Sequence, residues 1–246
     1  MPFDDNEFLS ESIETDTKPH LEPFSAWLQY SLELNMFVNH EKKVLQVAND
    51  DARKIVAAAL LLKMSNHYQS VISLLKRGLP VEAQIILRSM IQVLIHLRLL
   101  QKDERYIDTL IVSERAEQLK LLNVYTEPAN NDIFTPSNVH FETKKQLKKE
   151  LNGFRKDKIE CLADEEYMDI QGGELMSFHL GYDFHEYPRI FYTSNNLLLS
   201  AADFIHDIFK DTFDEKRSLE FTEKLKYYHD KFVKLSGIDP DLAPND

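Results

Sequence analysis

The sequence predicts an all-α protein, a bundle of about seven to eight helices around a central antiparallel helical hairpin. Three observations carry this prediction. Apolar residues recur at helical spacing over most of the 246 residues, only 6 residues are glycine, and no stretch alternates as a strand would. A hydrophobic share of 43% and a charged share of 28% are ordinary for a chain that buries a core.

The chain begins with an acidic segment, residues 1–20, which we expect to be a flexible or loosely docked arm. It lacks an apolar centre and so does not resemble a secretory signal. A first helix is expected over 23–47, with Pro23 suited to its first turn. Residues 49–51 (Asn-Asp-Asp) then resemble a cap and acidic first turn for a second helix that ends at Arg77.

The clearest boundary between two helices in the sequence is Gly78-Leu79-Pro80. Glycine suits the left-handed residue after a helix, and proline suits the first turn of the next one. A connection this short makes its two helices antiparallel neighbours, and this pair is the central hairpin. The second helix of the pair, 80–101, is apolar on most sides, so it is expected to be buried.

Further elements follow the hairpin. They are a helix over 104–124, a loop over 125–136, a strongly charged helix over 141–162, an irregular aromatic stretch over 167–187, a helix over 188–213 and an amphipathic helix over 215–235. Residues 21–236 are therefore predicted to form one helical domain, and residues 237–246 a disordered tail.

A seam of polar residues is predicted inside the hairpin. Gln84, Arg88, Gln92 and His96 fall at four-residue steps, which places them on one helix face. Folding the helices about the turn brings Ser73 level with Gln84, Ser70 with Arg88, and Asn66 with Gln92. A buried guanidinium needs an acceptor, and the reachable carboxylates are Glu104, Glu114 and Glu117.

Two interpretations of Arg88 stay open. In the first, the arginine ties helices together through a carboxylate. In the second, it is the centre of a pocket for an anion, and His179 turns back toward it to make a composite site with catalytic potential.

Other chemistry has less support. His179, Asp183, His185 and Glu186 offer metal donors, but their spacing matches no zinc pattern, so no metal site and no cofactor are predicted. Because Cys161 is the only cysteine, no internal disulfide can form. The sequence around it gives no support for a role as a catalytic nucleophile. The apolar stretches are too short or too interrupted for a membrane span, and the net charge of −12 argues against broad nucleic-acid binding. A cytoplasmic location is expected.

The hairpin residues resemble a large bacterial family of unknown function, number 5677. The resemblance lies in the turn Leu74 to Gly78, in Glu82-Ala83, and in the pair Arg88-Ser89, with a weaker match at Ser177 and His179. Relatives carry an acidic residue where this chain has Gln92. The resemblance covers roughly residues 55–205 and implies an all-helical fold without an established activity.

Some helical proteins of this kind are similar to the HEPN group of small nucleases, whose signature is an arginine followed four to six residues later by a histidine. In this chain the distance from Arg88 to His96 is longer. Three functions therefore remain as expectations. The first is a helical interaction or regulatory module, homo-oligomeric and acting through protein partners, in a bacterial antiviral defence or stress system. The others are a metal-independent ribonuclease that uses Arg88 with His179 or His96, and a sensor of a small anion or nucleotide.

Overall fold

The computed structural model describes residues 10–45, 47, 50–128, 137–153 and 185–237, and these residues contain helices and no strand. They fall into two compact units. The first unit comprises Met1–Asp103 and Phe178–Asp246, and the second comprises Glu104–Ser177. The all-α prediction is confirmed. The boundaries proposed for an arm, one domain and a tail stay predictions, and most of the tail lies outside the described residues.

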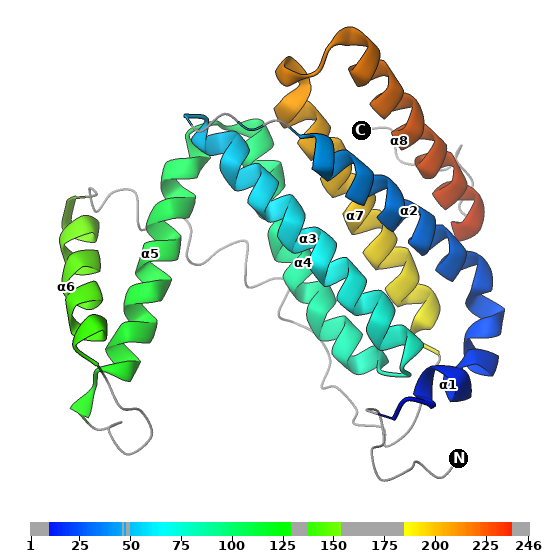
Figure 1. The fold of residues 1–246 in the computed structure, drawn as a ribbon, viewed down its shortest axis with the longest axis horizontal. Helices are drawn as coiled ribbons and strands as arrows, with labels where there is room; N and C mark the ends of the chain where they lie inside the picture. The colour runs from blue at the N-terminus through cyan, green and yellow to red at the C-terminus, as the bar shows by residue number, and fades with distance from the viewer. Residues whose placement is uncertain (1–9, 46, 48–49, 129–136, 154–184, 238–246) are drawn as a thin grey trace. The chain divides into compact units, whose positions relative to one another are not determined.

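The described part of the first unit contains six α-helices, which are α1 (Ile13–Leu21), α2 (Ser25–Val44), α3 (Ala52–Lys76), α4 (Pro80–Lys102), α7 (Tyr187–Phe209) and α8 (Glu215–Ser236). Figure 1 shows α3 and α4 side by side as an antiparallel pair, with α7 along both of them and α2 between α3 and α8. Within the part of the expected arm that is described, α1 docks on α3. The Thr17 hydroxyl donates to the Lys76 carbonyl at 2.5 Å, and Ile13 is buried.

The predicted hairpin turn is confirmed in atomic detail. Gly78 has a φ of 77°, in the left-handed region where a side chain is strained. Its amide donates to the Leu75 carbonyl at 3.1 Å, and the Leu79 amide donates to the Leu74 carbonyl at 2.9 Å. These two bonds close the end of α3 as a Schellman motif, and Pro80 begins α4. Asp51 caps the start of α3, accepting from the Lys54 amide at 2.9 Å.

Helix α7 buries more residues than either hairpin helix, because one wide face of it is apolar and faces α3, α4 and α2. The core of the first unit therefore lies between the hairpin and α7. The buried residues of α4 are Pro80, Ala83, Leu87, Met90, Val93, Leu97 and Leu100. They recur every three or four positions, so α4 buries a single stripe rather than its whole circumference.

In the second unit, the residues that the structure describes form a pair of helices, α5 (Tyr106–Tyr125) and α6 (Asn138–Gly153). Val112 and Leu147 are buried between them, and Lys144 Nζ donates to the Thr126 hydroxyl at 2.7 Å. The Tyr125 and His140 rings stack with centroids 6.0 Å apart at the end of the pair. Residues 154–162, the end of the charged helix predicted from the sequence, lie outside the described residues.

Candidate functional site

The expected burial of the polar seam is wrong, because most of its residues lie on the outside of the hairpin. Arg88 and Gln92 are exposed on α4, and Asn66 and Ser70 are exposed on α3. The Ser70 hydroxyl donates to the Asn66 carbonyl of its own helix at 2.9 Å. The physical reason is the period of α4, since Arg88 and Gln92 fall opposite the buried stripe through Leu87 and Met90. An exposed guanidinium stays hydrated and needs no buried countercharge.

The remaining seam residues have other surroundings. Gln84 Nε2 donates to Glu186 Oε2 at 3.1 Å, which ties the start of α4 to the start of α7. His96 is half-buried on α4. His179 lies outside the described residues, so the composite site of Arg88 and His179 stays a prediction, as do the catalytic and binding roles of the whole seam. Of the proposed carboxylates, Glu117 pairs with Lys120 on α5 at 2.6 Å.

The buried polar residues that the structure does bring together come from α2, α3 and α7. Asn195 and Tyr68 are 0% exposed, and the Tyr68 hydroxyl donates to Asn195 Oδ1 at 2.6 Å. Asn195 Nδ2 donates to Ser31 Oγ at 3.0 Å and to the Phe191 carbonyl at 2.7 Å. Burial raises the pKa of Tyr68 well above its usual range, so the hydroxyl remains a neutral donor. This Asn195 network is sealed from solvent and therefore positions helices rather than binding a ligand.

A second set of polar contacts joins α2 to α8. Glu41 is 4% exposed, and both Arg217 and Lys224 of α8 pair with it, the Lys224 Nζ at 3.5 Å. Farther along, Lys231 Nζ lies 2.5 Å from Glu33 Oε2, and this hydrogen bond lowers the pKa of the Glu33 carboxyl. These ion pairs hold two helices that are far apart in the sequence against each other.

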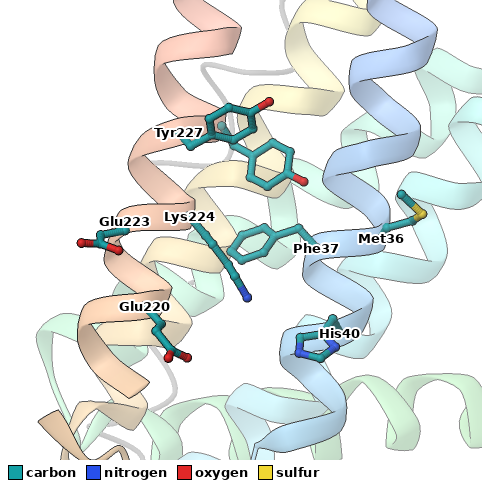
Figure 2. Close-up of a pocket in the computed structure, with 8 residues that line it drawn as sticks. Met36, Phe37, His40, Glu220, Glu223, Lys224 and Tyr227 are labelled. Atoms are coloured by element: carbon teal, nitrogen blue, oxygen red, sulfur yellow. The ribbon is translucent and has the colours of Figure 1, made fainter. Parts of the chain in front are cut away.

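Between these two ion-pair sites an open groove of about 570 Å³ separates α2 from α8, and we call it the α2–α8 groove. Figure 2 shows its lining side chains, which are Met36, Phe37, His40, Glu220, Glu223, Lys224, Tyr227 and Tyr228. Phe37 is buried beneath it and stacks on Tyr228, with ring centroids 5.0 Å apart. Met36 is 65% exposed and Tyr227 is 57% exposed, so the groove offers apolar surface to solvent.

Large apolar side chains are also exposed in the second unit, where α5 ends and α6 begins. We call this set of residues the apolar tip, and its members are Leu121, Val124, Tyr125, Val139 and Phe141. Leu121 is 60% exposed and Val139 is 67% exposed. Few other residues of this helix pair are buried, because two short helices cannot enclose a core of their own.

The sequence interpretation missed both surfaces, although signals for them exist. On α5, Leu121 and Tyr125 are four residues apart, and on α2 Met36 and His40 have the same spacing, opposite the buried stripe. The sequence interpretation assigned no role to the exposed Leu121 and Met36 of these two helices. Within the described ranges, no group of three or more His, Cys, Asp or Glu residues could hold a metal ion. Of the four possible metal donors considered in the sequence, His179 and Asp183 lie outside the described residues.

One helix of the described part, α4, is long and apolar enough to cross a membrane by length and composition. The same test is passed by core helices, and α4 packs against α3 and α7. The location of the protein therefore stays a prediction.

Comparison with known proteins gives one match. No curated protein and no solved structure matches the chain. A model of the Family of unknown function (DUF5677) matches residues 54–180, which is more than half of the sequence. The match includes the α3–α4 turn, which carries the resemblance found in the hairpin residues, and it also includes α5 and α6. No such match supports the HEPN resemblance. The chain belongs to the Family of unknown function (DUF5677).

Proposed function

We propose that this protein is a helical protein–protein interaction module that forms a homodimer through its second unit. The observation that carries the proposal is the exposed apolar tip at the end of the α5–α6 pair. Monomeric proteins rarely leave adjacent large apolar side chains in water, and such patches mark binding surfaces. A cytoplasmic location and a place in a bacterial defence or stress system remain predictions beside this proposal.

The small number of buried residues in α5 and α6 supports a partner that covers these helices. Val112 is the only residue of α5 that is fully buried, although the helix runs for 20 residues. Isolated helices of this length are marginal in water and owe their stability to packing of an amphipathic face. A second helix pair against the first would complete a four-helix arrangement in which the apolar tips are covered.

Charge also favours a second copy as the partner. Helix α6 carries four lysines and two glutamates, a net charge of +2, whereas α5 carries three acidic residues against Arg115 and Lys120, a net charge of −1. A two-fold pairing places the α5 helix of one copy beside the α6 helix of the other, so opposite charges meet twice at the rim. Faces of about 24 Å by 20 Å on each copy, from helix length and spacing, bury roughly 1,000 Å² over the two copies, which is the lower limit for a specific dimer.

Sedimentation velocity of the full chain at micromolar concentration tests the proposal. The parent is expected at twice the 28.8 kDa chain mass. Leu121→Glu and Phe141→Glu place charge in the apolar tip and are expected to shift the protein to the monomer mass. Both side chains are already exposed, so the helical circular dichroism should be retained.

The matched control is Leu62→Glu on α3, where the leucine is 50% exposed in the first unit. It should sediment like the parent. A monomeric parent would contradict self-association, and a dimer that Leu62→Glu dissociates while Leu121→Glu leaves intact would place the interface elsewhere.

A further inference from the structure

We infer that Lys42 of α2 is a nucleophilic lysine that accepts acyl groups from activated small-molecule donors, the acyl phosphates and thioesters. The inference starts from the surroundings of its amine. Lys42 is half-buried where α2 packs on α3, and its Nζ donates to Ser65 Oγ at 3.1 Å. A hydroxyl is a neutral acceptor, so this hydrogen bond leaves the charge of an ammonium group uncompensated.

The hydrogen-bond network that continues from Lys42 contains no carboxylate. The Ser65 hydroxyl, which is buried, donates onward to Asn39 Oδ1 at 3.3 Å. Asn39 Nδ2 donates to Asn35 Oδ1 at 3.0 Å, and the same oxygen accepts from Gln69 Nε2 at 3.1 Å. Every partner in this chain of side chains is neutral, so none of them stabilises a positive charge on Lys42 as an ion pair would.

The charged neighbours of Lys42 along α2 do not compensate it either. Glu41 precedes it, but Arg217 and Lys224 of α8 pair with that carboxylate. Lys43 follows it and adds a second positive charge. Among the residues that the structure describes, Lys42 therefore has no acidic partner.

These surroundings favour the neutral amine. Burial, and then the charge of Lys43, lowers the pKa of Lys42. Lys54 is the opposite case, because its side chain is only 12% exposed but lies 2.7 Å from Asp211, and that hydrogen bond raises the pKa of Lys54. Only a neutral amine has the lone pair that attacks a carbonyl carbon, so Lys42 is prepared for nucleophilic attack at neutral pH.

The acylation step fits this site. The lone pair of Lys42 Nζ attacks the carbonyl carbon of the donor and forms a C–N amide bond, while the bond from that carbon to the phosphate oxygen or the thioester sulfur breaks. Phosphate or thiolate leaves with the bonding electrons, and the proton lost by the amine passes to the leaving group or to water. The product amide keeps one N–H, which can still donate to Ser65, and the half-buried positive charge is removed.

Acetylation of the full chain at pH 7.5, followed over time by peptide mass spectrometry, tests the inference. Acetyl phosphate is the reagent in one arm and a small acetyl thioester in the other, with N-acetyl-lysine amide added as a reference. Lys42 is expected to react at least about threefold faster than Lys43, although Lys43 is the more exposed of the two. The rate at Lys42 should also level off at a lower pH than the rate of the reference amine, whose pKa is about 10.4.

Two variants test the electrostatic cause. Asn39→Asp introduces a carboxylate one turn from Lys42 with little change in volume and should slow its acetylation, relative to the reference amine, at least about threefold. Lys43→Ala removes the neighbouring cation and should slow it to a smaller extent. Asn66→Asp adds the same charge on the exposed face of α3 and is the matched control, expected to react as the parent does. Circular dichroism confirms that each variant is folded.

Two results would overturn the inference. One is acetylation of Lys42 no faster than that of Lys43 with both reagents. The other is an unchanged rate at Lys42 in both Asn39→Asp and Lys43→Ala. Selective acetylation of Lys42 by one reagent alone would support the inference and assign that class of donor.

Discussion

The Asn195 network makes the sharpest prediction about how the first unit is held together. Replacing Asn195 with alanine removes the α7 side chain that hydrogen-bonds to both Tyr68 of α3 and Ser31 of α2. Three hydrogen-bond partners lose Asn195 at once, and each neutral bond contributes about 1 kcal/mol net. The lost side-chain volume leaves a small cavity, which costs more.

Part of this loss is recovered by the neighbours. The Tyr68 hydroxyl lies 3.0 Å from the Ser31 carbonyl and can donate there instead, and the Ser31 hydroxyl already donates to the Trp27 carbonyl at 2.8 Å. We therefore expect Asn195→Ala to lower the free energy of unfolding by about 2–4 kcal/mol. For a chain of this size that corresponds to a melting temperature lower by roughly 5–15 °C.

Urea unfolding followed by Trp27 fluorescence measures this change. Trp27 is the only tryptophan and lies on α2, so it reports on the first unit alone. Asn66→Ala, an exposed asparagine on α3, is the control and should stay within about 0.5 kcal/mol of the parent. Tyr68→Phe should cost about 1 kcal/mol, and less again in the Asn195→Ala background, because the two residues share a bond. A cost below about 0.5 kcal/mol for Asn195→Ala, or strict additivity with Tyr68→Phe, would refute the reasoning.

Three further predictions concern titration and backbone. Burial raises the pKa of Tyr68 and of Tyr30. Their contribution to stability is therefore complete below about pH 10, which is the pKa of tyrosine in the unfolded chain, and it is lost as the pH rises toward the pKa values of the folded protein. Tyr68→Phe should reduce this loss of stability at alkaline pH, measured as urea midpoints. Burial, and then Lys63, lowers the pKa of His67, so stability falls as pH drops below about 6.5. His67 Nε2 is buried without a hydrogen-bond partner among the described residues, and His67→Leu should raise the free energy of unfolding by about 1 kcal/mol at acidic pH and less at pH 8, by chemical denaturation. Gly78→Ala should lower the free energy of unfolding by about 1–2 kcal/mol in the same assay, because alanine is strained at a φ of 77°, whereas an unchanged midpoint would contradict that strain.

Local signals in the sequence predicted the helices well. Gly78, Pro80 and Asp51 mark chain reversal and capping through their own backbone chemistry, so the turn and the start of α3 could be predicted without knowledge of the rest of the fold. The helix predicted over 215–235 agrees with α8 to within one residue for the same kind of reason, since Asp214 caps its start by accepting from the Arg217 amide at 2.7 Å.

The candidate sites could not be predicted in this way. Helical spacing shows that Gln84, Arg88 and Gln92 lie on one face of α4, but not whether that face is buried or exposed. Because α4 also carries apolar residues on its exposed side, its sequence does not distinguish the two faces. That choice depends on α7, more than a hundred residues away, which packs on the opposite face. The α2–α8 groove likewise needs the contact of Glu41 with Arg217, which no local pattern encodes.

Electron spin resonance distances between two copies would test the proposed dimer most directly. In a chain with Cys161→Ser and Lys145→Cys, each molecule carries one nitroxide on α6, so a dipolar distance arises only where two copies meet. We expect a defined distance below about 40 Å, since paired helices of the second unit are about 24 Å long and 10 Å apart. Adding Leu121→Glu should abolish it. A chain that gives no such distance, or the same distance with Leu121→Glu present, would contradict dimerisation through the apolar tip.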